Sequence, residues 1–144
     1  MIPVRKFLLA GFVVATGVAF AQAAATDPDV IARQDLMKII GGSSKTLGDM
    51  AGGKTAFDAA AAKAARDALV AASLEIEARF SKETNDPEQK AKAEVWTNRD
   101  DFLARARALT EAATALDPGS VEQIGAGMAD VGPICVACHK AYRR

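Results

Sequence analysis

The sequence is poor in histidine, cysteine and aromatic residues. Its 144 residues include one histidine, two cysteines, one tryptophan and one tyrosine. No stretch alternates polar and apolar residues over enough positions to predict a β-strand, whereas alanine is abundant and glycine and proline gather at a few boundaries. Acidic and basic side chains number 18 each, so no excess of positive charge indicates a nucleic-acid partner. These features predict an all-α protein.

The first residues have the pattern of a secretory signal peptide. Arg5 and Lys6 precede an uncharged, largely apolar run over residues 7–20, and small residues follow. We expect cleavage after Ala21, which leaves residues 22–144 as a single domain. The apolar run is shorter than the roughly 18 residues of a spanning helix, and no later run is longer, so we expect no membrane-spanning segment.

Loss of the leader removes two basic side chains, which leaves 16 basic and 18 acidic ones. The exported chain is therefore close to neutral. From this balance we expect no long-range electrostatic steering toward one kind of partner.

The strongest motif lies near the carboxyl end, where the chain reads Cys135-Val136-Ala137-Cys138-His139. This spacing is typical of covalent haem c attachment, in which each sulfur bonds a vinyl group and the histidine binds the iron. On a helix the three side chains share one face. His139 is the only histidine of the chain, so we expect it to be the proximal ligand.

Three other interpretations compete for the two cysteines. A thioredoxin-like redox pair starts a helix after a strand, but no strand pattern precedes Cys135. A structural zinc site takes four nitrogen or sulfur ligands, and this turn offers three. A plain disulfide between Cys135 and Cys138 would leave the adjacent histidine unexplained. We therefore favour haem.

Capping signals and apolar spacing divide the rest into four helices. The first begins at Asp27-Pro28 and ends at Gly52-Gly53. Thr55 followed by Asp58 predicts the start of the second. Its apolar positions are Leu69, Ala72, Ile76 and Phe80.

Asp86-Pro87 predicts the start of the third helix. Its apolar residues recur every seven positions at Val95, Phe102, Leu109 and Leu116. Ser120 opens the fourth helix, whose apolar seam continues into the two cysteines. Because an interior proline removes a backbone donor, we expect a kink or short break at Pro133.

Short links between long helices favour an antiparallel, up-down-up-down four-helix bundle. In that topology the first helix lies alongside the fourth, so Met37 can face His139. Met50 lies at the far end of the first helix and Met128 on the histidine's own helix. Whether Met37 binds the iron or packs beside an open coordination position is not decided by the sequence.

The chain resembles the class II c-type cytochromes, which include cytochrome c′. The resemblance lies in residues 135–143, in Arg33-Gln34 with Met37, and in Glu94-Val95-Trp96. It implies a four-helix bundle that carries one haem c on Cys135 and Cys138. It also implies that Arg33 and Gln34 lie beside the haem propionates, that Arg143 lies near His139, and that Met37 occupies the distal position.

We expect an exported, periplasmic protein that transfers single electrons or reversibly binds nitric oxide or carbon monoxide, without turning over a substrate. Haem-catalysed peroxide reduction is an alternative, although no distal histidine is available as acid and base. A haem-free thiol-disulfide protein is another. The redox partner protein is not identified, and the resemblance favours a homodimer through the first two helices.

Overall fold

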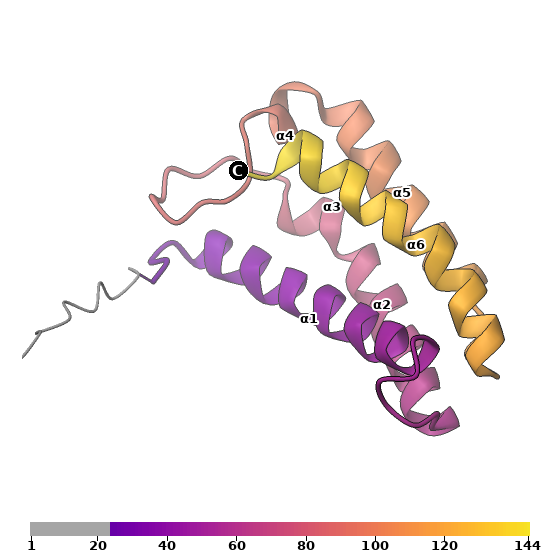
Figure 1. The fold of residues 1–144 in the computed structure, drawn as a ribbon. Coiled ribbons are helices and arrows are strands. Elements are labelled where there is room, and N and C mark those ends of the chain that lie inside the picture. The colour runs from indigo at the N-terminus through magenta and orange to yellow at the C-terminus, as the bar shows by residue number, and fades with distance from the viewer. Residues whose placement is uncertain (1–23) are drawn as a thin grey trace, which may run out of the picture.

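The computed structural model describes residues 24–144, in which six helices form four rods (Figure 1). They are α1 (Pro28–Ala51), α2 (Ala59–Leu74), α3 (Ile76–Arg79), α4 (Glu94–Thr97), α5 (Arg99–Ala115) and α6 (Val121–Tyr142). The short helix α3 continues α2 beyond Glu75, and α4 precedes α5 across Asn98. The expected leader, residues 1–21, lies outside the described residues.

The rods form a closed ring of neighbours. Helix α1 packs on α2, α2 on α5, α5 on α6, and α6 returns to α1. The chain reverses direction at each long link, so α1 and α6 run antiparallel (Figure 1). The predicted up-down-up-down four-helix bundle is confirmed. Within residues 24–144, no helix has both the length and the apolar character needed to cross a bilayer.

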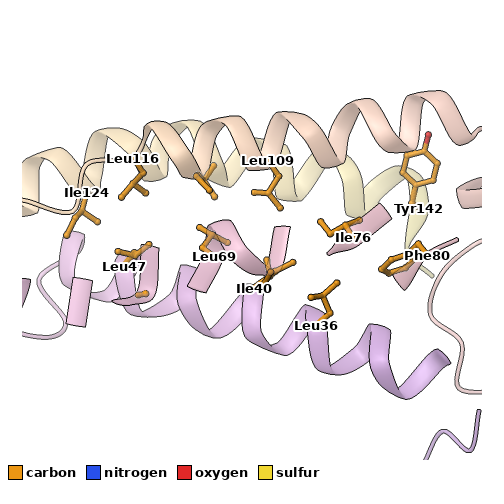
Figure 2. Packing of buried hydrophobic residues seen from close by; sticks show 14 of the residues in the cluster. Leu36, Ile40, Leu47, Leu69, Ile76, Phe80, Leu109, Leu116, Ile124 and Tyr142 are labelled. Atoms are coloured by element: carbon orange, nitrogen blue, oxygen red, sulfur yellow. The ribbon is translucent and has the colours of Figure 1, made fainter. Parts of the chain in front are cut away.

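One row of apolar side chains runs along the bundle axis (Figure 2). The predicted seven-residue repeat is buried throughout, at Val95, Phe102, Leu109 and Leu116. The predicted apolar positions of the second helix, at Leu69, Ala72, Ile76 and Phe80, are buried as well. Helix α1 starts as expected, because the Asp27 carboxylate accepts hydrogen bonds from the two backbone amides at positions 29 and 30.

Thr55 is not the cap of the second helix, so this prediction was wrong. The amides of Lys54 and Thr55 instead donate to the Asp49 carbonyl, at 2.8 and 3.2 Å, and extend the end of α1. The turn passes through Gly53, whose φ of 69° suits a residue without a side chain. Asp58 caps α2 instead, accepting from the Ala61 amide at 2.9 Å.

The third helix does not begin at Asp86-Pro87 either. The Asp86 carboxylate accepts from the Glu88 amide at 2.7 Å, which forms a local turn, and from the amides of Thr26 and Asp27, both at 2.8 Å. It thereby binds the start of α1 rather than opening a helix. The link 80–93 crosses the end of the bundle, and helix resumes at Glu94.

Of the expected kink or short break at Pro133, the short break does not occur. Helix α6 runs continuously from Val121 to Tyr142. The proline is exposed, and so is Ala129, whose carbonyl loses its helical donor. Water can satisfy this carbonyl, which offsets the hydrogen bond that an interior proline removes.

Two leucines of α2 provide a matched test of the core. Leu69 is fully buried at 0% exposure, whereas Leu74 is 66% exposed. We expect Leu69→Ala to lower the free energy of unfolding by about 2–5 kcal/mol, because it removes buried apolar contacts and leaves a cavity. Leu74→Ala should change it by less than about 0.5 kcal/mol. Urea unfolding followed by circular dichroism measures both; equal effects would contradict the packing described.

Candidate functional site

The last turns of α6 place the cysteine motif at one end of the bundle. Cys135 and Cys138 are free thiols, each partly buried, and both pack against the apolar core. His139 is exposed, and Val136 is 69% exposed. The two sulfurs therefore lie toward the core, while the imidazole of His139 lies at the surface beside them.

The electrostatics of the motif differ from those of a redox dithiol. Burial raises the pKa of the Cys135 thiol. Burial also raises the pKa of Cys138, although the nearby Arg105 guanidinium opposes this. Catalytic dithiols have a lowered thiol pKa, which supplies the reactive thiolate. Partial burial, followed by the positive charge of Arg143, lowers the pKa of His139 and favours the neutral imidazole that binds metals.

Tyr142 anchors the motif to α5, a role beyond that of an ordinary core aromatic. Its ring is buried and meets Phe102 edge-on, with centroids 5.3 Å apart. Its hydroxyl donates to the Asp101 carboxylate at 2.5 Å and accepts from Asn98 at 3.2 Å. Burial, and then the hydrogen bond to the Asp101 carboxylate, raise the pKa of Tyr142 to about 12. The phenol therefore stays protonated and fixes the end of α6.

Asp101 and Arg105 belong to the site, although the sequence analysis did not single them out. Arg105 Nε donates to the Asp101 carboxylate at 2.6 Å, and its guanidinium lies 6.0 Å from the centroid of the Tyr142 ring. Both charges are close enough to Cys138 to act on its thiol pKa. The available signal was their i,i+4 spacing on the predicted third helix, which brings opposite charges together.

Met37 is half-buried on α1 and packs against the same core cluster as Cys135 and Cys138. Met50 is buried near the other end of α1, and Met128 is half-buried on α6. Met37 therefore lies on α1, the helix that is expected to face the haem opposite His139. Its role as a ligand stays a prediction.

The Arg33 side chain is buried at 3% exposure, so it is not a solvated helix charge. Its Nε donates to the Arg79 carbonyl at 2.8 Å, and one terminal nitrogen donates to the Gln89 side chain at 3.0 Å. The other donates to the Lys82 carbonyl. The guanidinium also lies over the rings of Phe80 and Trp96, with centroids 5.4 and 5.3 Å away.

Gln34 and Asp86 fasten the same link. The Gln34 side-chain amide donates to the Glu88 carbonyl at 3.2 Å. Three backbone amides hold the Asp86 carboxylate and lower its pKa to about 2. In the structure Arg33 and Gln34 thus join α1 to residues 79–89. Their expected contact with haem propionates stays a prediction, as does the role of Arg143, which is exposed and lies near His139.

Residues 29–143 match the family model described as cytochrome C′. Cytochrome c-556 of Agrobacterium tumefaciens is 39% identical over 116 residues, which are 78% of this chain and 91% of that protein. Cytochrome c′ of Cereibacter sphaeroides is 32% identical and covers 96% of this chain and 97% of its own length.

The fold also resembles a solved structure, the nitric oxide complex of a cytochrome c′ mutant from Alcaligenes xylosoxidans. Its TM-score is 0.72 and its sequence identity 28%. The match covers 81% of this chain and 94% of the other.

The contacts of Arg33 predict that it holds the link between α3 and α4. We expect Arg33→Gln to speed amide hydrogen exchange across residues 79–90 on the order of tenfold, because loss of the guanidinium leaves carbonyls without donors at roughly 1–3 kcal/mol each. Arg79→Gln is the control, since that side chain is half-exposed and its one salt bridge within residues 24–144 is with Glu75. Unchanged exchange together with an altered haem spectrum would show that Arg33 serves the propionates instead.

Proposed function

This chain belongs to the cytochrome c′ family, and we propose on that basis that it is an exported mono-haem protein that transfers single electrons or reversibly binds nitric oxide or carbon monoxide. The observation that carries the proposal is the placement of Cys135 and Cys138 against the bundle core, with the only histidine directly after them. Two thioethers to these sulfurs would hold one haem c, with His139 as proximal ligand.

The residues present fit such a group. Both sulfurs are free, and they lie on a helix whose other core positions fix its orientation. The neutral form of His139 is favoured, and Met37 lies on the antiparallel helix. When bound, the haem would supply an iron that changes oxidation state by one electron or binds a diatomic gas. The protein's part is to orient it, and the apolar side chains of the core would keep water away.

Two alternatives are weaker on specific grounds. Peroxide reduction calls for a distal acid and base, and the sequence has no second histidine to provide one. Thiol-disulfide exchange calls for a reactive thiolate, whereas burial raises the pKa of both cysteines. We therefore propose a carrier or gas-binding role without substrate turnover.

A periplasmic location and a homodimer belong to the same proposal. The leader pattern in residues 1–21 supports export, and covalent haem attachment fits an oxidising compartment. The dimer through α1 and α2 rests on the family likeness.

Covalent haem is the first prediction to test. Full-length protein expressed in a strain that matures c-type haem should contain one haem per chain by the pyridine haemochrome assay, and intact mass should include it. Cys135→Ala and Cys138→Ala together should abolish the covalent mass increase, because no sulfur remains to bond the vinyl groups. Colourless wild-type protein whose two sulfurs titrate as ordinary thiols would refute the proposal.

Met37→Ala tests whether Met37 would bind the haem iron as a second ligand besides His139. If Met37 is a ligand, the ferrous protein is low-spin and the sulfur-to-iron band disappears in the variant. If it is not, the wild-type ferrous protein is high-spin and its spectrum responds to nitric oxide or carbon monoxide. Met128→Ala is the control, since this half-buried methionine lies on the histidine's own helix. A low-spin spectrum that Met37→Ala leaves unchanged would show that Met37 is misplaced.

A further inference from the structure

Two basic segments that lie far apart in the sequence meet beside the cysteine motif. Residues 90–92 pair with residues 142–144 through an antiparallel bridge between Ala91 and Arg143. The Lys92 amide donates to the Tyr142 carbonyl at 2.9 Å, and the Arg144 amide donates to the Lys90 carbonyl at 2.8 Å. Figure 1 shows the link between α3 and α4 reaching the end of α6 at this point.

The pairing gathers five cations, which we call the basic patch: Lys90, Lys92, Lys140, Arg143 and Arg144. Lys90 pairs with Glu88 at 3.1 Å, and the Lys92 ammonium donates to the carbonyls of Lys140 and Ala141, at 3.1 and 3.3 Å. The other three cations are exposed and make no salt bridge with any of residues 24–144.

The patch stands out against the charge of the whole protein. Residues 24–144 carry 16 basic and 18 acidic side chains, so the described chain is slightly negative. Within the bridge, Lys90 lies opposite Arg144, and like charges in that position weaken strand pairing. This opposition of Lys90 and Arg144 therefore does not stabilise the bridge, and binding of a negative partner would give the patch a use.

The patch also surrounds the point at which the motif reaches the surface. One face of α6 carries Val136 and the residues three, four and seven positions after it, which are His139, Lys140 and Arg143. All four side chains are exposed. Val136 supplies an apolar contact, and Lys140 and Arg143 lie on the same strip. An apolar contact with a charged rim is the composition of a small, transient protein interface.

We propose that the basic patch is the docking surface for an electron-transfer protein with a carboxylate-rich surface around its own redox centre. This inference rests on the proposed function. One electron would leave the ferrous haem and reduce the partner's oxidised centre by one, or pass in the reverse direction, and no bond or proton would be transferred. Attraction between the two surfaces would raise the encounter rate and orient the end of α6 toward the partner.

Small redox ions can test the electrostatic field at the patch. If the positive patch governs the encounter, added salt slows the reaction with an anion, whereas if the slightly negative net charge governs it, added salt speeds that reaction. The ferrous holoprotein would be oxidised by hexacyanoferrate(III), an anion, and by tris(phenanthroline)cobalt(III), a cation, in a stopped-flow instrument. Ionic strength would rise from about 0.01 M to about 1 M, which shortens the Debye length from about 30 Å to about 3 Å. The patch predicts that the anion rate falls on the order of tenfold and that the cation rate rises.

Matched variants separate the patch from overall charge. Lys140→Gln with Arg144→Gln should lower the anion rate several-fold at low salt and flatten its salt dependence. Lys54→Gln with Lys63→Gln removes the same charge from exposed positions at the opposite end of the bundle, and should leave the rate close to that of the wild type. Retention on a cation-exchange resin at low salt should fall in the first pair only, which gives a readout independent of electron transfer.

Two failures of this experiment are distinguishable. Absence of covalent haem in the wild type would refute the proposed function. Covalent haem with an anion rate that rises with salt, or with equal effects of the two variant pairs, would overturn the docking surface alone. Unchanged circular dichroism and haem spectra in both pairs establish that the variants are folded.

Discussion

The burial of one side of α6 fixes how this helix is rotated about its own axis, and the position of the cysteine motif follows from that rotation. Ile124, Val131 and Tyr142 are all buried against the other helices. With these positions inward, Cys135 and Cys138 must also lie toward the core, since they continue the same spacing. A rotation by one residue would move both sulfurs to solvent and expose the apolar seam.

Tyr142 secures this arrangement at the end of the helix, where packing alone would let the last turn fray. Its ring packs on Phe102, and its hydroxyl bonds Asp101, which Arg105 holds in turn. Lys92 donates to the last carbonyls of the helix, which complements the negative end of its dipole. The carboxyl end of α6 is thus fixed by α5 and by the link between α3 and α4.

The link between α3 and α4 is held to the bundle by polar contacts, whereas the helices pack through apolar side chains. Arg33 and Gln34 reach it from α1, and Asp86 binds the backbone at the start of α1. Because the same link pairs with residues 142–144, it connects both ends of the chain's described part near the cysteine motif. The Arg33 side chain is buried, and its guanidinium donors are satisfied by the carbonyls of Arg79 and Lys82 and by the Gln89 side chain. This explains why a charged side chain is buried there.

The sequence determined the helical class and the apolar seam, and it carries the motif from Cys135 to His139 on which the haem proposal rests. These depend on local spacing: apolar side chains at three- and four-residue steps define a buried face, and adjacent ligands define the haem interpretation. The caps at Asp27 and Ser120 were also predictable, because each acts on amides within three residues. Resemblance to a family with a specific motif added the neighbours of the iron only as expectations.

Tertiary structure decided what depends on partners far away in the chain. Asp86 has the local signature of a helix cap, but the amides of Thr26 and Asp27 compete for its carboxylate, so the third helix starts later. Thr55 lost its predicted role because its amide completes the end of α1. The near-zero net charge gave no sign of a basic patch, since a charge count carries no positions. Pairing of residues 90–92 with 142–144 brings those cations together, and only the folded chain places them side by side.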